Sequence, residues 1–218
     1  MQDTTVLLLA GGLSNRMGKD KRFVKLSGTP IIEKAIQSAK RLTPNLILSI
    51  HNEQDIERIK AISTSLKIVV DDNYDLRSPL LGIYSASKYV KTNSTIVLPS
   101  DSPIVLPSFI QIIVKYLEEF DAVVPTWPDG KIEAIHAAYR TDKLYTISKS
   151  LLNSRSLDVK SIPLAMQNVL FLSTEQIKNV DPNLVSLIDI DTPDDLQMYT
   201  KLNKQVQQYS ADQLALSQ

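Results

Sequence analysis

The chain of 218 residues contains no cysteine. This absence excludes disulfide bonds, thiolate metal sites and a cysteine nucleophile. A chain without cysteine fits a reducing compartment, so we expect a cytoplasmic protein.

The sequence also has no excess of charge of either sign, because 24 lysines and arginines balance 24 aspartates and glutamates. It therefore lacks the global basic field that binds nucleic acid or an anionic membrane. No apolar stretch approaches the roughly 20 residues that span a bilayer. The first apolar run follows no basic segment and stops at Gly11, so we expect no signal peptide. Any anion must be bound by a local cluster of cations.

No internal repeat or linker interrupts the sequence. The length suits one α/β domain, which we expect to span residues 1–202. Residues 203–218 are rich in glutamine and have few apolar side chains, which is typical of a polar tail that is either helical or frayed.

Short apolar runs alternate with longer segments whose apolar residues recur at helical spacing, as in 31–39 and 109–117. This rhythm predicts parallel strands joined by helical crossovers. In such open sheets, ligands bind at the carboxyl ends of the strands, so the residues directly after each strand are site candidates. The expected strands are 6–10, 46–50, 68–70, 95–98 and 122–124, then an extended hairpin segment at 132–139 and a last strand at 185–188.

The loop after the first expected strand carries two glycines and then a group of cations. Gly11 and Gly12 have no Cβ, so a ligand can lie against exposed backbone N–H groups there. Arg16, Lys19 and Lys21 follow closely. A backbone cradle beside several cations suits a polyphosphate.

Three other interpretations of this loop are weaker. A dinucleotide fingerprint needs G-x-G-x-x-G, but the glycines here are adjacent. A P-loop needs a hydroxyl residue directly after its lysine, whereas Lys19 is followed by Asp20. A simple Gly-Gly turn with solvated charges stays open, although the buried strand before it argues for a ligand site.

Polar residues follow the later strands as well. Asp101 comes directly after an apolar strand and lies between Pro99 and Pro103, which suits a rigidly placed oxygen ligand for Mg²⁺. A turn-capping role for Asp101 is the alternative. Asn52 follows the second strand and has the donor and acceptor groups to read a base or a ribose, but a turn residue is the simpler interpretation.

A longer pattern joins these features. The sequence has Leu-Ala-Gly-Gly at 9–12, Arg-Met-Gly at 16–18, Asp-Lys at 20–21, and then Leu26, Gly28 and Pro30. This series resembles the L-A-G-G-x-x-x-R-M-G-x-D-K signature of sugar-phosphate-type nucleotidyltransferases, and it is most similar to the molybdenum cofactor guanylyltransferases. The resemblance spans roughly residues 5–200 and implies a three-layer, open, mostly parallel, Rossmann-like α/β sheet of the nucleotide-diphospho-sugar transferase type.

The resemblance implies Mg²⁺-dependent transfer of GMP from GTP to the terminal phosphate of molybdopterin, with Mn²⁺ as an alternative metal. The acceptor phosphate is already an anionic nucleophile, so no general base is required. The implied roles are phosphate binding by Arg16 and Lys21, nucleotide binding by Leu9, Ala10, Gly11, Gly12, Asn52 and Asp71, and metal binding by Asp101 with Asp191 as a second, weaker ligand.

Two departures from the family pattern concern specificity. Ala134 stands where the family has proline, beside the acceptor candidates Glu133 and His136, and Ser78 replaces a glycine before the helix that contains Gly82. The alternatives are a cytidylyl- or guanylyltransferase for another phosphorylated acceptor, or a nucleotide-binding protein without activity. GTP and molybdopterin are the expected partners, with transient contact to molybdenum-cofactor enzymes or their chaperones, and with neither nucleic acid nor membrane.

Overall fold

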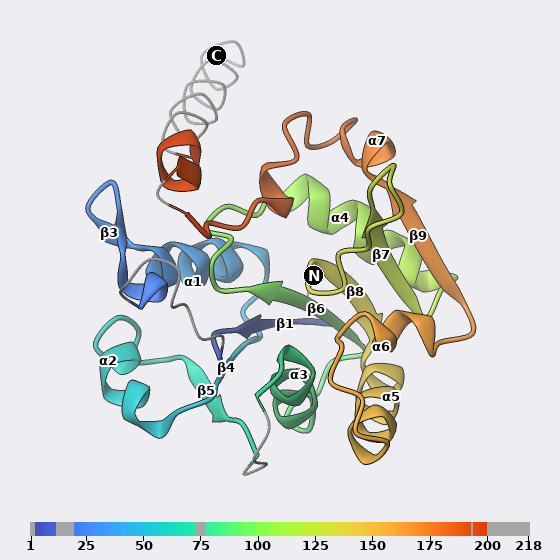
Figure 1. The fold of residues 1–218 in the computed structure, drawn as a ribbon, viewed down its shortest axis with the longest axis horizontal. Coiled ribbons are helices and arrows are strands. Elements are labelled where there is room, and N and C mark those ends of the chain that lie inside the picture. Colours follow the sequence, from blue (N-terminus) through green and yellow to red (C-terminus); the bar gives the residue numbers. More distant parts are fainter. Residues whose placement is uncertain (1–2, 12–19, 73–76, 193, 200–218) are drawn as a thin grey trace.

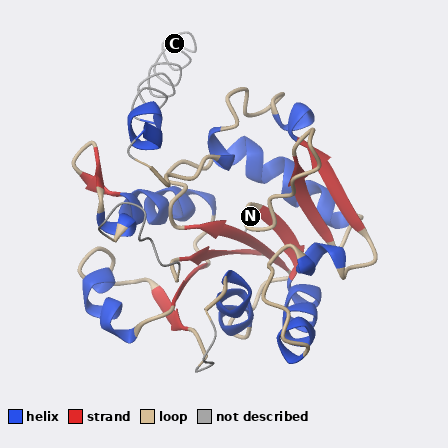
Figure 2. Ribbon diagram, in the orientation of Figure 1, coloured by secondary structure: helices blue, strands red, loops and turns tan. Residues whose placement is uncertain are grey.

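A computed structural model describes residues 3–11, 20–72, 77–192 and 194–199. These residues form a twisted seven-stranded sheet between two layers of helices (Figure 1). Figure 2 shows the same arrangement, with the strands passing through the middle of the molecule. The predicted three-layer, mostly parallel α/β fold is confirmed.

The strand order is β5-β4-β1-β6-β8-β7-β9, and within this sheet only β8 runs antiparallel to its neighbours. A separate small hairpin pairs β2 with β3. The strands are β1 (Thr4–Leu9), β2 (Lys25–Leu26), β3 (Thr29–Pro30), β4 (Leu46–Ile50), β5 (Lys67–Val70), β6 (Ser94–Pro99), β7 (Ala122–Thr126), β8 (Ala137–Arg140) and β9 (Val169–Ser173).

The helices connect these strands as crossovers and end-pieces. The α-helices are α1 (Ile31–Leu42), α2 (Ile56–Lys60), α3 (Pro79–Ser87), α4 (Pro107–Lys115), α5 (Thr141–Asn153), α6 (Ser161–Leu164) and α7 (Thr174–Ile177), and residues 194–199 are helical as well. Short 3-10 helices are η1 (Lys21–Phe23), η2 (Glu53–Asp55), η3 (Tyr116–Glu118) and η4 (Val185–Leu187). No helix of the described residues is long and apolar enough to cross a membrane.

Alternation along the central strands builds a core on each face of the sheet. Val6 and Leu8 of β1 pack with residues of α1 and α4, while Leu7 between them packs against α3 on the opposite face. On that opposite face, Val97 of β6 joins a cluster with residues of α3 and α5. Burial on both faces explains why these strands read as continuous apolar runs. It also holds their carboxyl ends rigidly at one edge.

Local signals place the helix that approaches this edge. Ser78 caps α3, because its Oγ accepts a hydrogen bond of 3.0 Å from the N–H of Leu80, and Pro79 occupies the first turn. Proline suits that position because its ring presets φ and its missing N–H has no helical partner there. The first turn of α3 lies at the edge where β1, β4 and β6 end, since Ser78 and Pro79 line the same space as residues that follow these strands.

The structure agrees with most expected strands and corrects two details. The five strands expected between residues 6 and 124 are all present, and the segment at 132–139 supplies the antiparallel strand β8. The apolar run 185–188 is not a strand, because residues 185–187 form η4, whose turn is fixed by the buried Asp181 carboxylate accepting from two backbone N–H groups. Strand β9 was not expected.

Two predicted site residues, Gly12 and Arg16, lie outside the described residues, and so do Lys19 and the expected tail at 203–218.

Candidate active site

A cavity of about 410 Å³ opens where β1, β4 and β6 end, beside the first turn of α3. Five of the predicted nucleotide-binding residues line it, and they come from different parts of the chain. They are Leu9, Gly11, Lys21, Asp71 and Asp101. The carboxyl edge of the sheet thus gathers most of the predicted nucleotide-binding residues around one space.

Lys21 joins two carboxylates at one side of this cavity. Its Nζ forms an ion pair with Oδ2 of Asp101 and lies 2.6 Å from Oδ1 of Asp191. Asp101 lies just beyond β6, which ends at Pro99, and its carbonyl accepts a 3.0 Å hydrogen bond from the N–H of Ile190, which ties the two acidic loops together. The predicted metal ligands Asp101 and Asp191 therefore share one cation, the Lys21 ammonium.

Asp101 is held in an environment that disfavours its charge. Burial and the nearby Asp189 carboxylate raise the pKa of Asp101, and the Lys21 ammonium offsets only part of this rise. Its Oδ1 is buried and has no hydrogen-bond partner among the described residues. Buried carboxylate oxygens normally have a partner, so this atom is suited to a cation ligand.

The described residues contain no group of three or more acidic, histidine or cysteine side chains placed to hold a metal ion. A pair of carboxylates is nevertheless a common protein contribution to a Mg²⁺ site, because substrate phosphates and water complete the coordination. The donor set here fits a metal that is bound together with a phosphate-bearing substrate.

On the other side of the cavity, Asp71 is almost fully buried. Ser49 Oγ donates to its Oδ1 at 2.7 Å, and His51 Nδ1 lies 3.4 Å from its Oδ2. Burial raises the pKa of Asp71, and the contacts with Ser49 and His51 offset the rise only in part. The carboxylate lies close to the backbone of both Gly11 and Gly82, where a Cβ would be 3.4 Å from its oxygens.

Arg22 anchors the segment that carries Lys21. Its guanidinium donates to Asp20 through two nitrogens, to Asp55 at 2.7 Å and to the carbonyl of Ala10 at 2.8 Å. Asp20 also caps η1, since its side chain accepts from the Arg22 N–H. One side chain therefore fixes the end of β1, the start of η1 and the segment after β4 relative to each other.

A second polar network lies behind Asp101. Ser102 Oγ donates to Asp189 Oδ1 at 2.6 Å and lies 2.9 Å from Nε2 of the fully buried His136. Burial acts to raise the pKa of Asp189, but His136 and Ser102 outweigh it, and the pKa is lowered. These contacts hold the acidic loop that begins at Asp189 against the loop that follows β6.

Two predicted nucleotide contacts are not among the residues that line the cavity. Ala10 is buried, and its backbone bonds to Ser49 and Arg22. Asn52 caps η2, because its Oδ1 accepts a 3.0 Å bond from the Gln54 N–H, as in the simpler turn interpretation.

The two acceptor candidates differ in their surroundings. Glu133 accepts a 2.7 Å bond from Trp127 Nε1 and pairs with Lys131, so its carboxylate is occupied within its own hairpin. His136 instead faces Ser102 and Asp189. Ala134 is buried, and its carbonyl accepts from the hydroxyl of Tyr139.

The cavity also contains residues that the sequence did not single out for it. Arg22, Arg77, Ser49 and Ile135 belong to its lining. Ser49 is the polar position in an otherwise apolar strand, and this was a usable signal, because a polar side chain inside a buried strand needs a partner. Arg77 gave no comparable signal, since a lone arginine before a helix is usually solvated.

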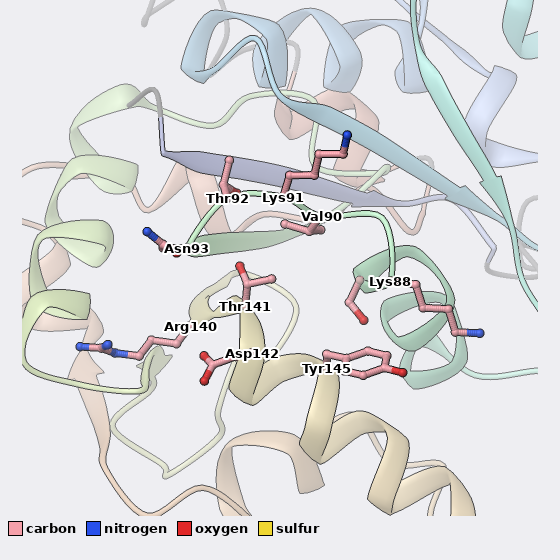
Figure 3. A pocket seen from close by; sticks show the side chains of 10 residues that line it. Lys88, Val90, Lys91, Thr92, Asn93, Arg140, Thr141, Asp142 and Tyr145 are labelled. Atoms are coloured by element: carbon pink, nitrogen blue, oxygen red, sulfur yellow. The ribbon is translucent and has the colours of Figure 1, made fainter.

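A larger cavity of about 660 Å³ lies elsewhere, between the end of α3, the start of β6 and the first turn of α5 (Figure 3). Asn93, Arg140, Asp142 and Tyr145 are among its lining residues. It is at the opposite edge of the sheet from the ends of β1 and β6, since Arg140 pairs with Ser94 at the start of β6. None of the predicted site residues lines it, so its size does not make it the candidate site.

Comparisons with known proteins identify the family of the chain. The sequence model of the MobA-like NTP transferase domain matches residues 6–161. The probable molybdenum cofactor guanylyltransferase of Methanosarcina mazei is 26% identical over 199 residues, covering 88% of each chain, and that of Natranaerobius thermophilus is 28% identical over 202 residues, covering 91% of this chain and 96% of the relative.

Solved structures share the fold. The molybdopterin-guanine dinucleotide biosynthesis protein A of Archaeoglobus fulgidus superposes with a TM-score of 0.79 at 22% identity, covering 92% of this chain and 99% of that one. The 4-diphosphocytidyl-2C-methyl-D-erythritol synthase of Anaerococcus prevotii gives a TM-score of 0.69 at 14% identity, covering 94% and 96%. With the family match over residues 6–161, the chain belongs to the MobA-like NTP transferases and is a nucleotidyltransferase.

Proposed function

We propose that the protein transfers GMP from GTP to the terminal phosphate of molybdopterin and releases pyrophosphate, with Mg²⁺ as the metal. The observation that carries the proposal is the contact of Lys21 with Asp101 and Asp191 at the carboxyl edge of the sheet, beside the cavity that Gly11 and Asp71 line. The relatives named as molybdenum cofactor guanylyltransferases supply the choice of nucleotide and acceptor.

The chemistry needs a positioned triphosphate and charge neutralisation more than it needs an acid or a base. An oxygen of the acceptor phosphate forms a bond with the α-phosphorus of GTP while the bond to the bridging oxygen of the β-phosphate breaks. The pyrophosphate leaves with that oxygen. Lys21, together with Arg16 from the first loop, would hold the charge that develops on the leaving phosphates.

Asp101 is the residue best suited to hold Mg²⁺, since its buried Oδ1 has no other partner among the described residues. Asp191 is the second ligand. When bound, Mg²⁺ would neutralise phosphate charge and orient the nucleotide. Asp101 also lines the nucleotide cavity, which supports a metal position where substrate phosphates could complete the coordination.

Ser78 stands where the family has glycine, and its contacts give little reason to expect a base other than guanine. Its hydroxyl caps α3 and donates to the carbonyl of Leu157 at 2.8 Å, so its polar group is used within the protein. Ser78 still lines the cavity, and a cytidylyltransferase is therefore the alternative that the experiment must separate.

The test measures thermal unfolding with GTP, CTP, ATP or NAD, each with and without Mg²⁺. Because a ligand that binds the native state raises stability by mass action, we expect the largest rise with GTP and Mg²⁺ together. Pyrophosphate release from GTP is then measured with molybdopterin as acceptor. Asp101→Asn should keep part of the GTP effect, lose the Mg²⁺ enhancement and release pyrophosphate roughly a hundredfold more slowly or worse.

Asp142→Asn is the matched control, because Asp142 is exposed, undergoes the same chemical change and lies in the larger cavity at the opposite edge. It should behave as the wild type. A preference for CTP would replace the proposed nucleotide, and a rise with NAD alone would contradict the phosphate-binding interpretation of the first loop. Unchanged turnover in Asp101→Asn would remove Asp101 from the metal site.

A further inference from the structure

Lys21 occupies an unusual place for a phosphate-binding lysine. Its ammonium is not directed into open space but lies between Asp101 Oδ2 and Asp191 Oδ1, and only 15% of its side chain is exposed. Burial acts to lower the pKa of Lys21, but the two carboxylates outweigh burial and raise it, so the group stays charged. The cation between Asp101 and Asp191 is therefore the Lys21 ammonium of the protein itself.

We propose that the Lys21 ammonium and a divalent cation compete for one position between Asp101 and Asp191, so that metal binding requires Lys21 to leave and become available to the nucleotide phosphates. The inference rests on the proposed metal role of these two carboxylates and adds how the site is regulated. In the substrate-free protein, the Lys21 ammonium therefore occupies the position that the metal takes when it binds.

The competition follows from the charges around the site. Asp101 and Asp191 both contact Lys21, and Asp189 is close enough to Asp101 to raise its pKa. Vacating the site would leave carboxylates facing each other with no cation, which is unfavourable in a partly buried environment. A divalent cation that bridges the two carboxylates would lie beside the Lys21 ammonium, where two positive charges repel each other. Exchange of one cation for the other keeps the carboxylates neutralised throughout.

The surrounding structure allows the ammonium to move without the backbone. Arg22, the next residue, is held by Asp20, Asp55 and the Ala10 carbonyl, so the segment that carries Lys21 is fixed. The lysine stem has four flexible carbons and a compact point charge. Lys21 also lines the nucleotide cavity, so a displaced ammonium has only to turn toward the space where phosphates would lie.

This arrangement makes metal and triphosphate binding interdependent. Metal binding alone must break both Lys21 contacts, so the affinity is reduced. A triphosphate offers the displaced ammonium new partners and removes that penalty. By linkage, the metal must then improve triphosphate binding by the same factor.

The first experiment titrates Mn²⁺ alone into the nucleotide-free protein by calorimetry, using the wild type, Lys21→Met and Lys25→Met. Lys25 is exposed and lies four residues away, so Lys25→Met changes the net charge equally without touching the site. We expect Lys21→Met to bind Mn²⁺ about tenfold more tightly than the wild type, in the usual range of coupling between sites, and Lys25→Met to match the wild type. A folded Lys21→Met protein that binds Mn²⁺ no better than the wild type overturns the proposal.

A second experiment needs no variant, so it decides the question even if Lys21→Met does not fold. Acetic anhydride labels accessible amines, and mass spectrometry reads the extent at Lys21 and Lys25 in the wild-type protein. Increasing Mg²⁺ without nucleotide should raise the labelling rate of Lys21 severalfold and leave that of Lys25 unchanged. A constant Lys21 rate up to saturating Mg²⁺ overturns the exchange. Neither experiment uses GTP or an acceptor, so either can fail while the guanylyl transfer proposed above still holds.

Discussion

Gly82 lies in α3 where the helix passes over the ends of β1 and β4. A Cβ at this position would be 2.9 Å from Ser49 Oγ and 3.5 Å from a methyl group of Leu9, closer than ordinary packing allows at the first contact. Alanine normally stabilises a helix relative to glycine by up to about 1 kcal/mol. Here overpacking should outweigh that gain, so Gly82→Ala should lower the free energy of unfolding by about 1 kcal/mol in urea titrations.

The same substitution should weaken nucleotide binding, because Ser49 donates to Asp71 and cannot retreat without disturbing that bond. Ser49→Ala removes the contacted oxygen, so the double variant serves as the control. It should be more stable than the sum of the two single effects predicts. Simple additivity would mean that the crowding at Ser49 does not cause the loss.

The buried Asp71 carboxyl should make the free energy of unfolding depend on pH. Burial raises its native pKa above the ordinary carboxyl value of 3.8. Below that value both the native and the unfolded state hold the proton; as pH rises through it, the unfolded state releases the proton first. The free energy of unfolding should therefore fall with rising pH until native Asp71 also ionises.

Asp71→Asn should lack this fall, and urea unfolding between about pH 3.5 and pH 7 measures the difference. The two curves should diverge upward from pH 3.8, with the variant gaining relative to the wild type. Parallel curves over this interval would contradict the raised pKa.

The position of η1 depends on the side chain of Arg22. Arg22 satisfies Asp20, Asp55 and the Ala10 carbonyl together, so Arg22→Gln leaves two partly buried carboxylates without their cation. We expect a loss of about 2 kcal/mol in the free energy of unfolding and a weaker thermal response to GTP, because the Lys21 segment is no longer fixed. Arg22→Lys should recover little, since an ammonium cannot reproduce the fork of contacts.

Arg58→Gln is the matched control for this element. Arg58 stacks over the Phe23 ring at 3.4 Å, beside Arg22, but it is not among the residues that line the cavity. The charge change is the same, and the expected effect on stability is within about 1 kcal/mol. An equal GTP response in Arg22→Gln and Arg58→Gln would show that Arg22 does not position Lys21.

At this scale the sequence predicted strands better than irregular segments. Runs such as 46–50 are buried on both faces, and continuous apolar residues are a direct sign of that burial. Residues 185–188 are similarly apolar, but 185–187 form η4, because the nearby Asp181 carboxylate accepts hydrogen bonds from the N–H groups of Val185 and Ser186. Strand β9 has an exposed Phe171 and, within the described part of the chain, pairs only with β7, so its apolar pattern alone could not identify it as part of the sheet.

Across the whole molecule, the rule that ligands bind at the carboxyl ends of parallel strands located the cavity. Asp101 and Lys21 could be predicted as site residues because each follows a local pattern, an apolar strand for Asp101 and a glycine loop for Lys21. The contact of Lys21 with Asp191 was not predictable, since it joins residues 170 positions apart. The network of Ser102 with Asp189 and His136 likewise exists only after folding.

The reversed direction of β8 has a consequence for how this architecture can diversify. Because β7 ends and β8 begins at the same edge, the segment 127–136 returns to the cavity, and Ile135 reaches its wall. The strands that carry Asp101 and the glycine loop lie on the other side of β8 in the sheet order. Insertions or deletions in this hairpin can therefore remodel one wall of the cavity while the parallel half of the sheet keeps its register, so substrate range and nucleotide chemistry can evolve independently.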